Sequence, residues 1–349
     1  MDLSFYRGKR VFVTGHTGFK GSWLCRMLVN AGAEVTGLSL DPPTEPNLFS
    51  RAGLATRMHS VVADIRDFEA LKAAFDDARP ELVFHLAAQP IVRESYRNPR
   101  LTYETNVMGT VNVLECVRLS PSVKSAVIVT TDKVYRNNEW CWGYREDDFL
   151  DGYDPYSNSK SCAELAAHSY VNSFLAAQGR AISTVRAGNV IGGGDFAADR
   201  IIPDCVRAAL SGRVIGVRNP HSTRPYQHVL EPLGVYMMIA ARQWENPALS
   251  GSYNVGPDDC DCLTTGELAQ RFCEAWGEGA AWEDQSEANA PHEASFLKLD
   301  CSRLKRAFGW QPRWHMDTCM RMTCRFAKAW RDGGDIPAEM DAEINEFME

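Results

Sequence analysis

Three glycines between an apolar run and a helical stretch constrain this chain most. Gly15, Gly18 and Gly21 follow the buried strand expected at residues 10–14 and open a helix expected at residues 21–31. In such a loop one glycine permits a tight turn, another lets the backbone approach a diphosphate, and a third lets the helix pack on the sheet. The positive helix end then favours an anion. The spacing therefore predicts a dinucleotide-binding loop.

The chain beyond this loop alternates apolar runs of strand length with amphipathic stretches of helix length. The expected strands span residues 34–40, 81–86, 124–130 and 181–186. One helix is expected to begin at Asp67, and two more are expected at residues 103–118 and 155–177. This period is typical of a doubly wound parallel (Rossmann) α/β sheet.

The regular alternation of strands and helices ends near residue 186, where glycine- and proline-rich loops and shorter elements begin. We expect an NAD-binding Rossmann domain over residues 1–185 and a smaller, mostly C-terminal α/β lobe for substrate over residues 186–349. An apolar helix at residues 229–243 is expected to return to the first domain.

Charge and composition exclude several classes of function. A net charge of −8 offers no basic field to nucleic acid or to an anionic membrane. No apolar run approaches the roughly 20 residues of a membrane span, and residues 1–8 lack the apolar core of a secretion signal. We expect a cytoplasmic protein with reduced thiols. Cys260 and Cys262 could hold a metal, but no second ligand pair with zinc spacing follows, so no metal is expected.

A polar cluster follows the strand expected at residues 124–130. Thr131, Asp132 and Lys133 place a hydroxyl, an acid and an amine at its end, and a Tyr156-x-x-x-Lys160 pair on the next helix can face them. Such a cluster can move protons around an alcohol while a cofactor takes its hydride. Alternatively, Asp132 and Lys133 form an ordinary surface ion pair worth under about 1 kcal/mol. That interpretation is less favoured at the carboxyl end of a central strand.

The choice between NAD and NADP depends on the end of the second strand. An acidic side chain there binds a ribose diol and repels a 2′-phosphate. Asp41 lies near the expected place, although the strand can end at Ser39, and no arginine stands beside it in the sequence. NAD is therefore favoured.

The motifs together resemble those of the extended short-chain dehydrogenase/reductase family. They are Gly15-x-x-Gly18-Phe19-x-Gly21, His85-Leu86-Ala87-Ala88-Gln89, Asn106 and Tyr156-x-x-x-Lys160. Within this family the chain is similar, from about residue 8 to residue 314, to the nucleotide-sugar 4,6-dehydratases. Most of these carry Asp-Glu at the strand end, whereas the branch that acts on CDP-glucose resembles this chain in its Asp132-Lys133.

The resemblance implies oxidation of a hexose at C4, elimination of water across C5–C6 and reduction at C6. Tyr156 would accept the C4 hydroxyl proton, with its pKa lowered by Lys160. Thr131, or Thr130 if the register differs, would orient the C4 oxygen. Lys133, when neutral, would take the C5 proton, and Asp132, when protonated, would protonate the leaving C6 hydroxyl.

Ligand-binding roles are expected for two further groups of residues. The expected NAD site comprises Gly15, Thr17, Gly18, Phe19, Gly21, Asp41, Asp64, Ile65, Leu86, Ala87, Ala88, Asn106, Tyr156 and Lys160. Arg224 is the best candidate to clamp the substrate diphosphate, and the weaker substrate candidates are Gln89, Asn189, Arg200 and Arg303. Asn106 is expected to support the site through backbone or water contacts, and the helices from Tyr103 and Pro155 resemble those that form a homodimer, or a dimer of dimers, in the family.

Two alternatives share this fold. A nucleotide-sugar 4-epimerase would need Tyr156 and Lys160 but no acid–base pair at C5 and C6, so Asp132-Lys133 argues against it. A dinucleotide-sensing protein without chemistry would need none of this set, and the fold alone does not exclude it.

Overall fold

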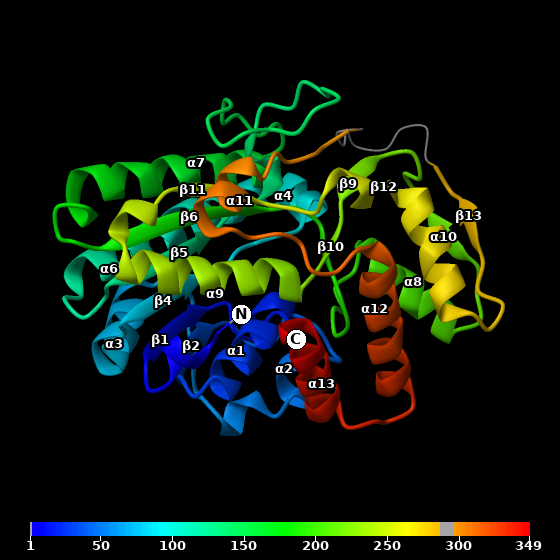
Figure 1. Cartoon of the computed structure of the whole chain (residues 1–349), viewed down its shortest axis with the longest axis horizontal. Helices are drawn as coiled ribbons and strands as arrows, with labels where there is room; N and C mark the ends of the chain where they lie inside the picture. Colours follow the sequence, from blue (N-terminus) through cyan, green and yellow to red (C-terminus); the bar gives the residue numbers. More distant parts are fainter. Residues whose placement is uncertain (1, 287–295) are drawn as a thin grey trace.

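A seven-stranded parallel sheet forms the centre of the protein, which is described here from a computed structural model covering residues 2–286 and 296–349 (Figure 1). The strand order is β11-β6-β5-β4-β1-β2-β3, and every neighbouring pair is parallel. The strands are β1 (Arg10–Thr14), β2 (Glu34–Ser39), β3 (His59–Val62), β4 (Leu82–His85), β5 (Ser125–Val129), β6 (Ala181–Ala187) and β11 (Ser252–Val255). The expected doubly wound fold is confirmed, and the chain direction across the sheet reverses between β1 and β4, where such folds bind ligands.

Apolar side chains alternate between the two faces of this sheet. Val11 and Val13 of β1 point into one buried cluster, and Phe12 between them points into another. One face is covered by α1 (Phe19–Asn30) and α9 (Leu230–Glu245), with α13 (Ile336–Met348) packed on α1, and the other by α3 (Phe68–Ala78), α6 (Gly109–Leu119) and α7 (Pro155–Tyr170). Helices on both faces explain why the strands are continuous apolar runs.

The helices begin and end close to where the sequence predicts. Asp67 caps α3 by accepting a hydrogen bond from the N–H of Ala70 at 3.1 Å. The helix expected at residues 103–118 lies in a longer helical run, formed by α5 (Pro99–Tyr103), a π turn (Glu104–Met108) and α6. The stretch expected at 155–177 is α7 followed by a second π turn (Val171–Leu175).

A second, smaller core lies beside the sheet domain. It is built around α8 (Ile201–Leu210), α10 (Thr265–Trp276) and α12 (Met316–Arg331), seen together at the right of Figure 1. Three two-stranded pairs accompany them: β7 (Val190–Ile191) with β10 (Gln227–His228), β8 (Ile215–Val217) with β13 (Trp282–Asp284), and β9 (Thr223–Pro225) with β12 (Cys262–Thr264). The remaining α-helices are α2 (Leu48–Arg51), α4 (Val92–Arg97) and α11 (Ser302–Phe308).

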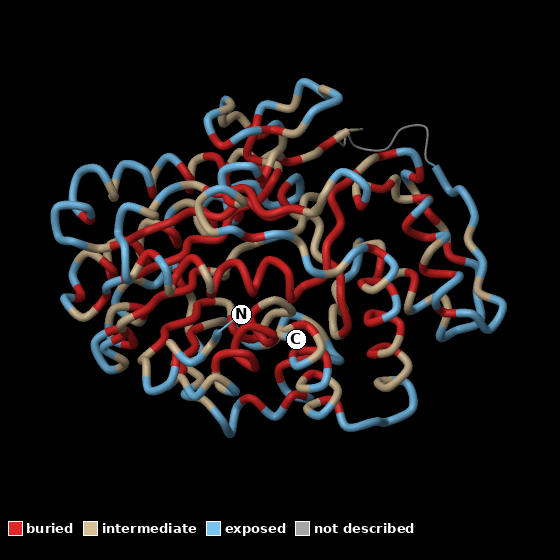
Figure 2. Tube along the Cα trace, in the orientation of Figure 1, coloured by how far each residue is buried: buried red, intermediate tan, exposed pale blue. Residues whose placement is uncertain are grey.

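Two segments after residue 186 belong with the sheet domain. The helix α9 is almost wholly buried against the sheet (Figure 2), and the Gln243 amide donates to the carbonyls of Ala126 and Ala181 at 3.0 and 3.1 Å. This is the return expected for residues 229–243. β11 falls within residues 186–349, which were expected to form the second lobe. It instead pairs with β6 and forms the edge strand of the central sheet. The rest of the division at residues 185 and 186 stays a prediction. In the described ranges, no helix combines the length and apolarity that crossing a bilayer requires.

Candidate active site

A cavity of about 1490 Å³ opens at the carboxyl ends of the central strands. Six stretches at or just after strand ends contribute to its wall: residues 15 and 17–21 after β1, 39–41 at the end of β2, 63–66 after β3, 86–89 after β4, 130–133 after β5 and 187–189 at the end of β6. Parallel strands bring their carboxyl ends to one edge, which is why residues far apart in the sequence meet here.

The three glycines of the loop differ in the space around them: Gly15 and Gly21 have no room for a side chain, whereas Gly18 has room for one. A Cβ on Gly15, whose φ is +77°, would lie 2.7 Å from the backbone nitrogen of Ala87, and one on Gly21 would lie 2.0 Å from the Gly15 oxygen. A Cβ on Gly18 would instead make only an ordinary contact, with the Gly15 carbonyl oxygen at 3.5 Å. Gly18 begins α1 without a side-chain cap, so the first N–H groups of α1 are left for a ligand. The loop therefore fits the diphosphate of NAD.

The far end of the cavity has the polar groups expected around an adenosine. The hydroxyls of Thr17 and Ser39 lie 2.8 Å apart at the end of β2, and Asp41 is exposed at the rim. Although no arginine neighbours Asp41 in the sequence, Arg66 also lines the cavity. Its guanidinium is paired with Asp64 at 2.6 Å, which lowers the pKa of that carboxyl. Ile65 between them is buried.

Asn106 holds the loop after β4 through backbone contacts, as expected. Its side-chain oxygen accepts from the N–H of Gln89 at 2.8 Å, and its amide donates to the Gln89 carbonyl at 3.1 Å and to the Ser159 hydroxyl at 2.9 Å. Leu86, Ala87 and Ala88 of this loop line the cavity. The side-chain amide of Gln89 donates to Thr102 at 2.8 Å, so it is engaged within the protein.

Tyr156 and Lys160 face the strand end from the first two turns of α7. Asp154 caps this helix by accepting from the N–H of Ser157 at 3.1 Å. Burial raises the pKa of Tyr156 to about 12, against a hydrogen bond with Thr131 that lowers it. The expectation that Lys160 lowers the Tyr156 pKa is not met, because desolvation dominates here and the Lys160 ammonium donates to the Val129 carbonyl at 3.2 Å. Burial lowers the pKa of Lys160 to about 8.

Thr131, Asp132 and Lys133 stand together at the cavity wall after β5. The Thr131 hydroxyl donates to Asp132 Oδ1 at 2.9 Å and also lies in hydrogen-bond range of Tyr156. Asp132 is buried, and its Oδ2 has no hydrogen-bond partner among the described residues. Lys133 is half-buried. A buried carboxyl oxygen without a partner, at the wall of a cavity, is suited to a polar group of a ligand.

The neighbouring hydroxyl, Thr130, is engaged away from the reacting set. It donates to Glu164, and Glu164 in turn forms a buried ion pair with Arg186 at 2.9 Å. Thr184 also donates to this carboxylate at 2.7 Å. Thr131 is thus placed to orient a substrate oxygen, and Thr130 supports the strand end from behind.

Lys20 is a cavity residue that the sequence reasoning missed. It sits in the glycine loop, and its ammonium donates to the Tyr236 hydroxyl of α9 at 3.2 Å. Burial and the charges of Lys160 and Arg200 lower the pKa of Lys20 to about 7, against Asp132, which raises it. The available signal was a lysine inside the glycine loop itself, between Phe19 and Gly21.

The substrate candidates are not all brought together. Arg224, Arg200 and Asn189 line the cavity. The Arg224 side chain is 95% buried and Arg200 pairs with Asp195 at 2.9 Å, so both are held in place. Arg303 is exposed, is not part of the cavity wall and pairs with Asp147 at 2.6 Å. It lies in α11, which contributes no residue to the cavity wall.

Such a site on such a fold defines an extended short-chain dehydrogenase/reductase. Comparison with known proteins narrows this class. The family described as GDP-mannose 4,6 dehydratase matches residues 12–323. The chain is 48% identical to a CDP-glucose 4,6-dehydratase of Salmonella typhimurium, over all of this chain and 98% of that relative. The chain therefore belongs to this family of NAD-dependent nucleotide-sugar 4,6-dehydratases, and the expected enzyme class and cofactor are confirmed.

More distant relatives include enzymes of another activity. A UDP-glucose 4-epimerase of Mycolicibacterium smegmatis is 28% identical over 87% of this chain and 94% of its own length. A dTDP-glucose 4,6-dehydratase structure from Bacillus anthracis, in complex with NAD, has a TM-score of 0.78 at 20% identity and covers 93% of this chain and 98% of its own. A UDP-glucose 4-epimerase structure from Stenotrophomonas maltophila has a TM-score of 0.80 at 22% identity, over 93% and 99%. The fold is shared by both activities, so the side chains must separate them.

Proposed function

We propose that this chain converts CDP-glucose to CDP-4-keto-6-deoxyglucose. The observation that carries the proposal is Asp132-Lys133 at the wall of the cavity that Tyr156 and Lys160 also line. The 48% identity with a CDP-glucose 4,6-dehydratase supports CDP as the nucleotide and glucose as the sugar. A 4-epimerase has no chemical use for an acid and an amine beside C5 and C6.

Tyr156 and Thr131 act at C4. When bound, NAD would supply the hydride acceptor for C4 and the hydride donor for C6. Tyr156 accepts the proton of the C4 hydroxyl, a role for which its pKa must fall below the raised value of the buried phenol. Thr131, already in reach of both Tyr156 and Asp132, orients the C4 oxygen. Lys160, fixed on the Val129 carbonyl, supplies a buried cation one turn after Tyr156 on the same helix.

Lys133 and Asp132 remove water. A ketone at C4 acidifies the C5 proton, which the Lys133 amine accepts, while the Asp132 carboxyl gives its proton to the C6 hydroxyl as that group leaves. The C5–H and C6–O bonds break and a C5–C6 double bond forms. Reduction at C6 and return of a proton to C5 then give the 6-deoxy-4-keto sugar, so the overall change is loss of one water.

Arg224 and Arg200 hold the diphosphate of the substrate, and Asn189 supports them. Arg224 is buried and reaches the cavity from β9, which suits a bidentate contact with phosphate oxygens. Asp41, Asp64 and Ile65 hold the adenosine of NAD at the other end.

The test is a panel of CDP-, dTDP-, GDP- and UDP-glucose, with the product of each analysed by mass spectrometry and NMR. The proposal expects CDP-glucose to be turned over fastest and to give a product lighter by one water. Faster turnover of another nucleotide would leave the dehydration intact but reject CDP. A product of unchanged mass, inverted at C4, would reject the dehydration itself.

The active form is a homodimer, alone or as a dimer of dimers, through the α5–α6 run and α7. These helices pack side by side and expose Met108 (52%) and Leu165 (56%). Light scattering on Leu165→Glu should report a monomer if this face is the interface. Leu210→Glu, at a similarly exposed leucine on α8 (43%), is the matched control and should leave the mass unchanged. An unchanged mass for Leu165→Glu would reject the interface.

The enzyme works in the cytoplasm. All eleven cysteines are free thiols, as a reducing compartment requires. Fluorescence of the tagged chain in its own cell would place it, and a membrane or envelope signal would contradict the proposal.

A further inference from the structure

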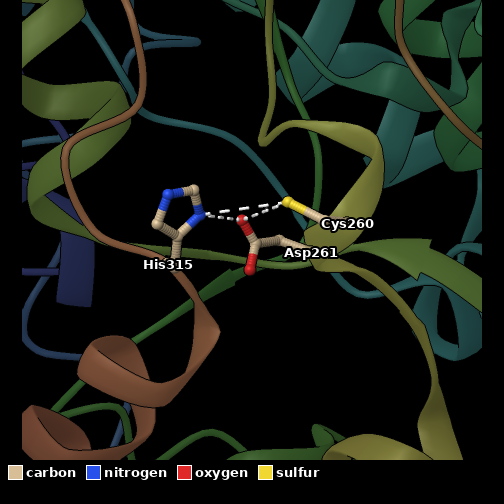
Figure 3. Close-up of side chains that lie close together, drawn as sticks. All are labelled: Cys260, Asp261 and His315. Atoms are coloured by element: carbon tan, nitrogen blue, oxygen red, sulfur yellow. Dashed lines mark hydrogen bonds and ion pairs between the residues drawn. The ribbon is translucent and has the colours of Figure 1, made fainter.

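Three metal-ligand side chains meet outside the cavity (Figure 3). Cys260 and Asp261 lie in a 3₁₀ turn (Asp259–Asp261) just before β12, and His315 immediately precedes α12. The two segments are 54 residues apart in the sequence and are brought together by the packing of α10 against α12. None of the three side chains has a role in the chemistry above.

The three donor atoms form a triangle of suitable size for a metal ion. His315 Nδ1 lies 2.7 Å from Asp261 Oδ2, and Cys260 Sγ lies 3.6 Å from the same oxygen and 4.0 Å from the nitrogen. An ion placed between them would be about 2 Å from all three atoms, which matches the bond lengths of zinc to nitrogen and oxygen, and a small shift away from Cys260 would give the bond of about 2.3 Å to sulfur. The side chains point toward one another in Figure 3.

Asp261 is fixed in the orientation that such a site needs. It is 95% buried, and its Oδ1 accepts a hydrogen bond from the Met316 N–H at 2.8 Å, which leaves Oδ2 directed at His315 and Cys260. A metal-bound carboxylate is commonly held by a second hydrogen bond of this kind. Cys260 and His315 are exposed, so water can reach the fourth position of a tetrahedral ion.

We propose that Cys260, Asp261 and His315 form a zinc site that ties the turn before β12 to the start of α12. The thiol and the imidazole would lose their protons to bind, and one water would complete the shell. β12 pairs with β9, with Leu263 opposite Arg224. The ion would therefore stabilise the β9–β12 pair, which carries the cavity residue Arg224.

Zinc binding to the full chain, first stripped with a chelator, tests this site. Equilibrium dialysis against ZnCl₂ should give one zinc per chain at saturation, and Tm should rise with zinc. Cys260→Ser and His315→Asn should each weaken binding at least about tenfold. Cys141→Ser and His221→Asn remove an exposed thiol and an exposed imidazole elsewhere, and should bind zinc as the wild type does.

Cobalt serves as a spectroscopic probe of the thiolate ligand. Co²⁺ bound to the wild type should show a sulfur-to-metal charge-transfer band, and the band should be absent in Cys260→Ser and present in Cys141→Ser. Tm of both variants without metal should match that of the wild type, since both thiols are exposed. Equal zinc affinity in the wild type, Cys260→Ser and His315→Asn would overturn the proposal, as would a wild type that binds no zinc.

Discussion

The Lys160 ammonium of α7 lies 3.2 Å from the carbonyl oxygen of Val129, the last residue of β5. This contact fixes the helix that carries Tyr156 to the strand end that carries Thr131, Asp132 and Lys133. Together with the buried hydrogen bond from Thr130 to Glu164, it positions the two halves of the proposed chemistry relative to each other before any ligand arrives.

Tyr156→Phe should cut turnover by roughly 10²–10⁴, the range for a lost general base, and leave NAD affinity within a few-fold. The phenol is buried and in reach of Thr131, so removal of its oxygen deletes the proton acceptor for C4 without opening a cavity. Steady-state kinetics and a cofactor titration measure the two effects. Near-normal turnover would remove Tyr156 from the mechanism.

Lys20→Met should change how stability depends on pH. Because the folded-state pKa of Lys20, about 7, is below the usual 10.5, the unfolded chain binds more protons between these values. The contribution of Lys20 therefore becomes more unfavourable as pH falls from 10.5 to 7, by less than about 1.4 kcal/mol per pH unit since the cavity admits water. Denaturant unfolding at several pH values should show the free energy of unfolding of Lys20→Met rising relative to that of the wild type as pH falls from 10.5 to 7. Parallel curves would mean that Lys20 is ordinarily solvated.

The ion pair behind the site should show strong coupling. Arg186→Met leaves the Glu164 carboxylate buried without its cation and should lower the free energy of unfolding by about 3–5 kcal/mol. The double variant Arg186→Met/Glu164→Met should lose less than the sum of the two single variants, because no charge is then stranded. Additive losses in a double-mutant cycle would show that the two side chains do not depend on each other.

Local patterns predicted the parts of this site that depend on local geometry. The glycine spacing, the Asp67 cap and the polar residues at the end of β5 all follow from neighbouring residues. Lys20 and Arg303 depend on long-range packing instead. Lys20 reaches Tyr236, which lies 216 residues away on α9, and Arg303 is turned toward Asp147 by the placement of α11. Strand β11 was not predicted for the same reason, because its pairing with β6 depends on long-range packing rather than on neighbouring residues.

Lys133→Met should separate the two halves of the reaction. C4 oxidation needs only Tyr156, Thr131 and Lys160, whereas loss of water needs the amine. A single turnover quenched with borodeuteride should therefore give CDP-hexose labelled at C4 that has kept its C6 hydroxyl. Asp132→Asn should stall similarly but retain part of the proton exchange at C5. Normal dehydration by Lys133→Met would assign the C5 proton to another base.

The reaction of the wild-type enzyme with CDP-glucose in deuterated water tests the central claim most directly. Elimination across C5–C6 exposes C5 to a solvent proton, so a dehydratase must release a 6-deoxy-4-keto sugar that carries deuterium at C5. NMR and mass spectrometry of the product should show that label together with the loss of one water. A hexose of unchanged mass and without deuterium at C5 would mean that Asp132-Lys133 takes no part in chemistry and that the proposed function is wrong.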